Sequence, residues 1–221
     1  MRTVIAGGHG QIALRLERLL AARGERPAGI IRRPEQAQDL VDAGAEPLLL
    51  DLEAATAPQL ARLLTGADAV VFAAGAGPGS GAARKNTVDR DAAVLLADAA
   101  ELAGVRRYVM VSTMAADAGA HHPDEVFEAY LRAKGAADDT VRSRTALDWT
   151  VLRPGRLTDG PGTGLVRLAP SVDRGTVDRA DVAAVLAALL HAPGTAGLTL
   201  ELVAGNATVE EAVAVAAGHD G

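Results

Sequence analysis

Residues 3–13 read TVIAGGHGQIA, and this stretch decides the fold of the 221-residue chain. A short apolar run leads directly into a G-x-x-G-x-x-A turn, and an amphipathic segment follows the turn. Gly7 permits a tight turn, Gly10 lets the backbone approach a pyrophosphate at a helix N-terminus, and Ala13 lets helix and strand pack closely. The stretch predicts a strand–turn–helix unit that binds a dinucleotide. Taken alone, a glycine-rich loop of this kind is about as often a purely structural turn as a dinucleotide-binding site.

Short apolar runs and longer amphipathic segments alternate along the chain, which favours the dinucleotide-binding interpretation. The expected strands are residues 3–6, 28–31, 47–50, 69–73, 107–111 and 149–152, and the expected helices are residues 11–23, 34–43, 56–65, 87–103 and 123–144. Continuous apolar runs indicate strands that are buried on both faces, and helical crossovers between them imply a parallel sheet. Gly24 and Gly44 stand where helix C-caps belong, and Pro34 opens the second helix. We predict a doubly wound, Rossmann-like α/β fold.

Residues 1–221 are expected to form one NAD(P)-binding domain, because a chain of this length can bury a single large core. After Leu152 the pattern loosens into a glycine-rich stretch. About residues 155–180 are expected to form a substrate-side segment that covers the cleft. A helix over residues 179–191, a strand over 198–203 and a helix over 209–217 are expected to follow.

The composition excludes several classes of protein. The chain has no Cys, which rules out disulfides, thiolate zinc sites and cysteine nucleophiles, and no metal site is expected. A net charge of −6 argues against nucleic-acid binding, which needs a basic surface. No stretch approaches the ~20 apolar residues of a membrane helix, and the N-terminal apolar run is too short for a signal peptide. We expect a cytoplasmic monomer or homodimer with a small-molecule substrate and no membrane partner.

Two arginines, Arg32 and Arg33, follow the second expected strand. In NAD-binding proteins a carboxylate at this position holds the adenosine ribose 2′-hydroxyl. Guanidinium groups instead suit a 2′-phosphate, through charge-assisted hydrogen bonds. The pair therefore favours NADP(H) over NAD(H) as the cofactor, the alternative being that both side chains simply face solvent.

The next strand ends supply further candidate contacts. Asp51 follows the third strand, where its carboxylate could bind the adenine amino group or, equally well, cap the next helix. Small residues end the fourth strand and would let a cofactor lie against bare backbone. The expected cofactor contacts from the turn and these strand ends are Gly7, His9, Gly10, Gln11, Ile12, Arg32, Arg33, Asp51, Leu52, Ala73, Ala74 and Gly75.

Tyr130 and Lys134 stand four residues apart in an expected helix, and so on one helical face. The chain has only two Tyr and two Lys, which makes a chance pairing a weak explanation. A nearby cation favours the phenolate, so Lys134 would make Tyr130 a usable proton donor and acceptor. At the end of the fifth strand, Ser112 or the neighbouring Thr113 could hold a substrate carbonyl or serve only as a turn hydroxyl.

These features, together with residues 149–155 (WTVLRPG) and 177–183 (VDRADVA), resemble the atypical short-chain dehydrogenases/reductases. The chain looks like their single-domain NAD(P)-binding group, related to flavin/biliverdin reductases and NmrA-like proteins. The resemblance implies Tyr130 as acid/base, Lys134 on the nicotinamide ribose, Ser112 or Thr113 near the carbonyl, and Pro154 with Gly155 beside the nicotinamide. The expected function is an NADP(H)-dependent oxidoreductase acting on a carbonyl, quinone or flavin-type acceptor. The alternatives are an NmrA-like redox sensor and, less favoured, a nucleotide-sugar epimerase or dehydratase.

Two departures from that pattern concern His9, where the family often has a small residue, and Ser112, which lies 18 residues before Tyr130. Other candidates have simpler interpretations. Residues 121–125 (HHPDE) are expected to form a solvated helix-entry loop, the alternative being a substrate-side role for His122. Lys85, Asn86 and Asp89 are expected to be solvated or capping, the alternative being that they contact the cofactor. The rare aromatics Phe127 and Trp149 are expected in the core, the alternative being that they form a wall of the substrate site.

Overall fold

The computed structural model describes residues 1–77, 79–81 and 84–218. Its main element is a nine-stranded sheet in the order β11-β8-β10-β6-β5-β4-β1-β2-β3. The parallel strands are β1 (Arg2–Ala6), β2 (Arg26–Ile31), β3 (Glu46–Leu49), β4 (Ala69–Phe72), β5 (Arg107–Val111), β6 (Asp148–Pro154) and β10 (Leu198–Ala204). The predicted Rossmann-like α/β fold is confirmed.

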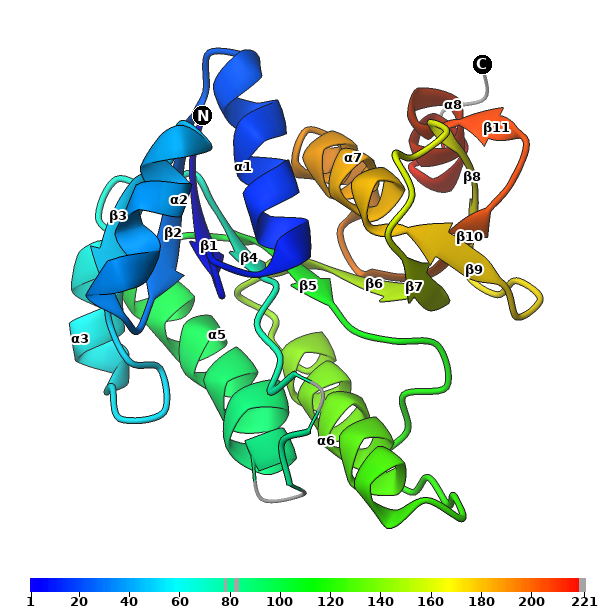
Figure 1. The fold of residues 1–221 in the computed structure, drawn as a ribbon, viewed down its shortest axis with the longest axis horizontal. Coiled ribbons are helices and arrows are strands. Elements are labelled where there is room, and N and C mark those ends of the chain that lie inside the picture. Colours follow the sequence, from blue (N-terminus) through cyan, green and yellow to red (C-terminus); the bar gives the residue numbers. More distant parts are fainter. Residues whose placement is uncertain (78, 82–83, 219–221) are drawn as a thin grey trace.

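Helices cover both faces of the sheet (Figure 1). On one face lie α1 (Gln11–Ala22), α7 (Arg179–Leu190) and α8 (Val209–Ala216), and on the other lie α3 (Ala57–Leu63), α5 (Ala92–Ala103) and α6 (Glu125–Arg142). The short α2 (Ala37–Asp42) follows η1 (Pro34–Gln36), and η3 (Pro193–Thr195) precedes β10. Each face buries its own hydrophobic cluster, as a sheet between two helical layers requires. In the described part of the chain, no helix is long and apolar enough to cross a membrane.

Helix ends follow the local chemistry of the sequence. Gly24 and Gly44 follow the ends of α1 and α2 with φ of +75° and +79°, a conformation that glycine adopts without steric cost. At the start of α6, the Asp124 carboxylate accepts the backbone N–H groups of Val126 and Phe127. This cap fixes the helix that carries both Tyr130 and Lys134.

The chain after β6 is more ordered than the sequence indicated. It contains β7 (Arg156–Thr158) and β9 (Thr176–Asp178), which pair as a separate two-stranded sheet. It also contains β8 (Leu165–Ala169), which pairs antiparallel with β10 and with β11 (Ala207–Thr208). The sheet is therefore mostly rather than wholly parallel. These strands are short, and β7, β8 and β9 each begin directly after a glycine, so the alternation of buried and exposed residues, as in β8, is hard to see in the sequence.

Candidate active site

The carboxyl ends of the parallel strands open into two adjoining pockets. The first, which we call the Arg32 pocket, is lined from the ends of β1, β2, β3 and β4. The second, the Tyr130 pocket, lies toward β5, α6 and η2 (Lys85–Asp91). Residues 73–75 line both pockets, so one elongated ligand can extend from one into the other. Ligands of open α/β sheets bind at such a rim, where the strand order reverses between β1 and β4.

The glycine turn fits a dinucleotide. Gly7 has φ of +83°, and a Cβ there would lie 2.6 Å from the Cα of Ala74, so no larger residue has room. The N–H of Gly10 donates to the carbonyl of Gly7 at 2.8 Å, and Gly10 is the N-cap residue of α1. Among the described residues, no side chain caps this helix by a hydrogen bond. Its first N–H groups can therefore bind phosphate oxygens, and Ala13 beneath them is completely buried.

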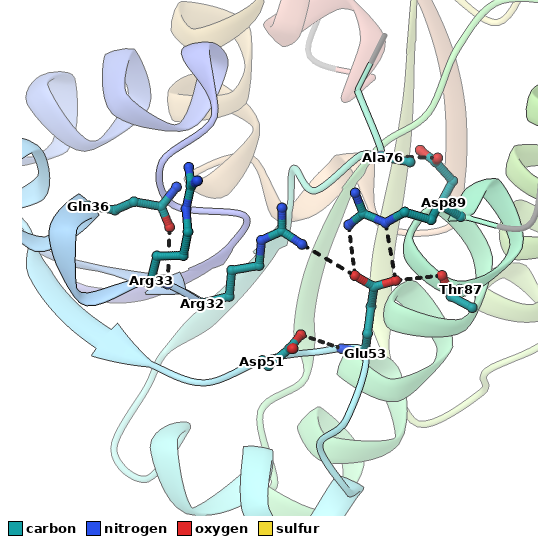
Figure 2. Close-up of polar contacts among 9 residues, drawn as sticks. Arg32, Arg33, Gln36, Asp51, Glu53, Ala76, Thr87 and Asp89 are labelled. Carbon is teal, nitrogen blue, oxygen red and sulfur yellow. Dashed lines mark hydrogen bonds and ion pairs between the residues drawn. The ribbon is translucent and has the colours of Figure 1, made fainter. Parts of the chain in front are cut away.

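The two arginines after β2 separate in the structure. Arg32 lines the pocket named after it, whereas Arg33 is exposed and lines neither pocket. The backbone N–H of Arg33 donates to Gln36 Oε1, which joins it to the first turn of η1 (Figure 2). Of the two side chains, Arg32 lines this pocket and Arg33 does not, and a contact of Arg33 with the cofactor stays a prediction.

Glu53 is a pocket residue that the sequence reasoning missed. It lies two residues after Asp51 and faces three groups, as Figure 2 shows. Its Oε2 accepts from Arg84 Nη2 at 2.7 Å, its Oε1 accepts from Thr87 Oγ1 at 2.7 Å, and Arg32 Nη1 lies 3.5 Å from Oε2. The hydrogen bonds from Arg84 and Thr87 hold the pKa of the Glu53 carboxyl below its usual value. Besides Asp51, the pocket therefore contains a second acid, Glu53, and both come from the chain after β3 rather than from the end of β2.

Asp51 also lines the Arg32 pocket, but it does not cap the next helix. Its Oδ1 accepts the backbone N–H of Glu53 at 3.0 Å, and Thr56 is the N-cap residue of α3. The helix-cap alternative for Asp51 is therefore wrong. Its contact with adenine stays a prediction.

Three of the remaining predicted cofactor contacts, His9, Leu52 and Ile12, line one of the two pockets, and Gln11 lines neither. His9 and Leu52 line the Arg32 pocket, where His9 Nε2 also lies 2.6 Å from Asp39 Oδ2. Ile12 lines the Tyr130 pocket. Gln11 is exposed and lines neither pocket.

Tyr130 lines the second pocket beside apolar side chains. Its ring centroid lies 5.9 Å from that of Phe127, and Ile12 and Leu157 complete an apolar wall. Phe127 is 43% exposed, so the expectation that it belongs to the core is wrong, whereas Trp149 packs against the core. Leu157 comes from the segment expected on the substrate side.

Lys134 is buried next to Asp89 at the edge of the same pocket. The two side chains are 5% and 1% exposed, and Lys134 Nζ lies 3.3 Å from Asp89 Oδ1. Nζ also donates to the carbonyl oxygens of Val111 at 3.2 Å and Ala74 at 3.5 Å. An ammonium group has three donors, and two of them donate to backbone carbonyls here, while the contact with Asp89 Oδ1 is an ion pair without a hydrogen bond. The contact of Lys134 with a nicotinamide ribose stays a prediction, in which a ribose hydroxyl would take over the longest of these contacts.

Lys85 and Asp89 are buried, so their expected role as solvated or capping residues is wrong. They lie four residues apart in η2, a π-helical turn, and both line the Tyr130 pocket. Lys85 Nζ donates to the carbonyl of Gly77 at 2.9 Å and lies 5.3 Å from the centre of the Tyr130 ring. Both lysines of the chain thus border the pocket that contains Tyr130. The spacing of four residues between Lys85 and Asp89 was the available signal.

Ser112 and Thr113 can now be distinguished by position. Ser112 is 5% exposed and lines the Tyr130 pocket, whereas Thr113 does not line it. Behind Ser112 lies Asp138, a buried carboxylate paired with Arg153 at 2.7 Å. Burial raises the pKa of Asp138, and the Ser112 hydroxyl and Arg153 oppose that shift. A catalytic role for Ser112 stays a prediction.

Pro154, His121 and His122 line neither pocket, whereas Asp124, the N-cap residue of α6, lines the Tyr130 pocket. Pro154 is buried, lines neither pocket and accepts the N–H of Met114 through its carbonyl. His121 and His122 are exposed, as expected of a helix-entry loop. The His122 ring makes an edge contact with Phe127, with centroids 4.8 Å apart.

Comparisons with known proteins agree with this geometry. Residues 7–193 match the family described as NAD(P)H-binding. A Bacillus subtilis (strain 168) protein named "Uncharacterized sugar epimerase YhfK" is 34% identical, over 96% of this chain and 99% of that protein. The solved structure of a putative NAD-dependent epimerase/dehydratase from Bacillus halodurans is 33% identical with a TM-score of 0.88, over 96% of this chain and 98% of that one.

A second solved structure, the oxidoreductase ylbE from Lactococcus lactis, is 26% identical with a TM-score of 0.86 and covers 99% of this chain and 98% of its own. The resemblance to atypical short-chain dehydrogenases/reductases is therefore confirmed. The chain belongs to the NAD(P)H-binding family, whose cofactor is a nicotinamide dinucleotide.

Proposed function

We propose that this protein is an NADP(H)-dependent oxidoreductase that reduces a small carbonyl, quinone or flavin-type acceptor. The observation that carries the proposal is the joining of the two pockets: residues 73–75 connect the Arg32 pocket to the pocket that Tyr130 lines. When bound, the coenzyme supplies the hydride. The protein then has to hold it, exclude water and provide a proton.

The glycine turn and Arg32 supply the binding part of this proposal. The uncapped N-terminus of α1 would hold the pyrophosphate. Arg32 at the rim would bind a 2′-phosphate, which is why we favour NADP(H) over NAD(H). Residues 73–75 carry at most a methyl group and would let the extended molecule lie close to the backbone.

The chemical part of the proposal rests on Tyr130. In carbonyl reduction, hydride adds to the carbonyl carbon while the phenol of Tyr130 gives its proton to the carbonyl oxygen. Lys85 Nζ lies 5.3 Å from the centre of the Tyr130 ring and Lys134 lines the same pocket, so two cations border the place where the phenol would give up its proton. Phe127, Leu157 and Ile12 keep this step in a largely apolar environment.

The test has two stages. The protein is first titrated with NADPH and with NADH by calorimetry, and acceptors of the three classes are then screened at the nicotinamide absorbance. NADPH binding followed by oxidation with one acceptor class supports the proposal. Failure to bind either coenzyme would overturn it, and binding without turnover on any acceptor would favour a redox-sensing protein instead.

A second candidate function is that of an epimerase. It is suggested by the names of two similar proteins, a sugar epimerase and an NAD-dependent epimerase/dehydratase. An epimerase returns the hydride to its product, so it causes no net oxidation of NADPH. Incubation with nucleotide sugars, followed by product analysis, separates the two. The segment after β6 favours the reductase, because it pairs into strands against the sheet rather than extending as a sugar-nucleotide subdomain.

A further inference from the structure

We propose that Glu53 sets the coenzyme preference by opposing the binding of a 2′-phosphate at Arg32. This inference rests on the proposed function only in assuming that a nicotinamide coenzyme occupies the Arg32 pocket. It assigns to Glu53 a specificity-determining role and to Arg84 a positioning role.

The contacts of Glu53 carry the first step. Arg84 and Thr87 both hydrogen-bond to its carboxylate at 2.7 Å, so they fix its position from the side of η2. Arg32 approaches from β2, to 3.5 Å, without a hydrogen bond (Figure 2). The Arg32 side chain is 47% exposed, and its donors therefore remain open to a ligand.

The second step is electrostatic. A phosphate group at Arg32 carries nearly two negative charges, and the Glu53 carboxylate would repel it across the same guanidinium. A ribose 2′-hydroxyl carries no charge and can donate a hydrogen bond to the carboxylate. Glu53 should therefore weaken the binding of NADPH and leave that of NADH unchanged or strengthened. The pocket would accept both coenzymes, and its preference for NADPH would be weaker than it would be if Arg32 were present without Glu53.

Arg84 acts through Glu53. Two of its nitrogens face the carboxylate, Nη2 at 2.7 Å and Nε at 3.5 Å. Without Arg84, Glu53 would lose its main partner and would pair more fully with Arg32. Arg32 would then be less available to a phosphate, so loss of Arg84 and loss of Glu53 should change NADPH binding in opposite directions.

The experiment measures Kd for NADPH and for NADH by calorimetry in the wild type and in the Glu53→Gln and Arg84→Gln variants. Glu46→Gln is the matched control, since Glu46 also pairs with an arginine, Arg2 at 3.7 Å, but lines neither pocket. Glu53→Gln should tighten NADPH binding by about five- to tenfold, equivalent to ~1–1.4 kcal/mol, and change NADH binding by less than about twofold. Arg84→Gln should weaken NADPH binding several-fold.

The outcomes distinguish failure of the inference about Glu53 and Arg84 from failure of the proposed function. If Glu53→Gln changes both coenzymes by one factor, or weakens NADPH, the inference is overturned while the proposed function stands. If Arg84→Gln tightens NADPH, its positioning role is overturned. If the wild type binds neither coenzyme, the proposed function itself fails. A change in the control as large as that in Glu53→Gln would show a nonspecific charge effect and would also overturn the inference.

Discussion

The two pockets handle charge in opposite ways. In the Arg32 pocket the charges are held at the surface: the side chains of Arg32 and Arg84 are 47% and 40% exposed. In the Tyr130 pocket Lys134 and Asp89 are almost completely buried. Exposed ion pairs contribute little to folding, whereas breaking a buried pair is costly. The first pocket can therefore change its ligand preference at little cost in stability, and in the second pocket function and folding are coupled.

The largest expected effect lies in the Tyr130 pocket. Tyr130→Phe removes the proton donor and keeps the ring, so turnover of a carbonyl substrate should fall by about 10²- to 10⁴-fold. Coenzyme binding should stay within about twofold, because the hydroxyl is not part of the Arg32 pocket. Steady-state rates and calorimetric Kd values check both parts. An unchanged rate on a carbonyl substrate would contradict the acid/base role.

The next effect is on folding. Lys134→Ala leaves Asp89 buried without its charge partner, and the free energy of unfolding should fall by about 3–5 kcal/mol in urea titrations. Asp89→Asn in the same chain should recover part of that loss, since it removes the unpaired charge. Equal stability of Lys134→Ala and the wild type would mean that the pair is not buried as described.

A third effect arises beneath the glycine turn. Glu17 is completely buried, neither carboxylate oxygen has a hydrogen-bond partner among the described residues, and Oε1 faces Gly8 and Gly29. Burial raises the pKa of Glu17 from 4.5 to about 8, and the nearby Arg18 opposes the shift. The folded protein therefore keeps a proton that the unfolded chain releases. Between about pH 4.5 and 8 the free energy of unfolding should fall as pH rises, by about 4 kcal/mol in all.

Glu17→Gln should remove this part of the pH dependence. Urea titrations at pH 5 and pH 8 would measure it, because only the wild type should lose stability between the two. Identical pH profiles for the two proteins would show that Glu17 is not buried in its neutral form.

The smallest expected effect belongs to the Arg32 pocket and completes the comparison. Arg32→Ala should weaken NADPH binding by about tenfold and NADH binding much less, while the free energy of unfolding stays within about 0.5 kcal/mol. Calorimetry and urea titration of one sample give both values. Equal loss of affinity for the two coenzymes would remove the argument for a 2′-phosphate at Arg32.

The parts of the molecule that follow from local sequence could be predicted. The turn at Gly7 and Gly10 and the pairing of Tyr130 with Lys134 depend on spacing within one strand–helix unit or one helix. Strand β8 was missed because its alternation is short and lies between Gly164 and Pro170. Although Lys134 was identified as a site residue, the sequence did not indicate that it would pair with Asp89. A π-helical turn, which the sequence pattern does not predict, places Asp89 next to Lys134.

The acid in the Arg32 pocket shows a different limit. Sequence reasoning looked for a carboxylate after β2, because that is where one commonly binds ribose. Glu53 comes from the loop after β3, and Arg84 comes from the start of η2, 31 residues further along the chain. Tertiary packing brings these two segments together, and no residue pattern within either segment predicts their contact.

The contact between Gly7 and Ala74 limits how this protein can diverge. A Cβ at position 7 would lie 2.6 Å from the Cα of Ala74 and 2.8 Å from its backbone N, and 2.9 Å from the Ala74 methyl carbon. Trimming Ala74 to glycine would remove only the methyl group and leave the main-chain obstacle in place. Reversion, rather than a compensating change at position 74, is therefore the route open to a lineage that loses this glycine.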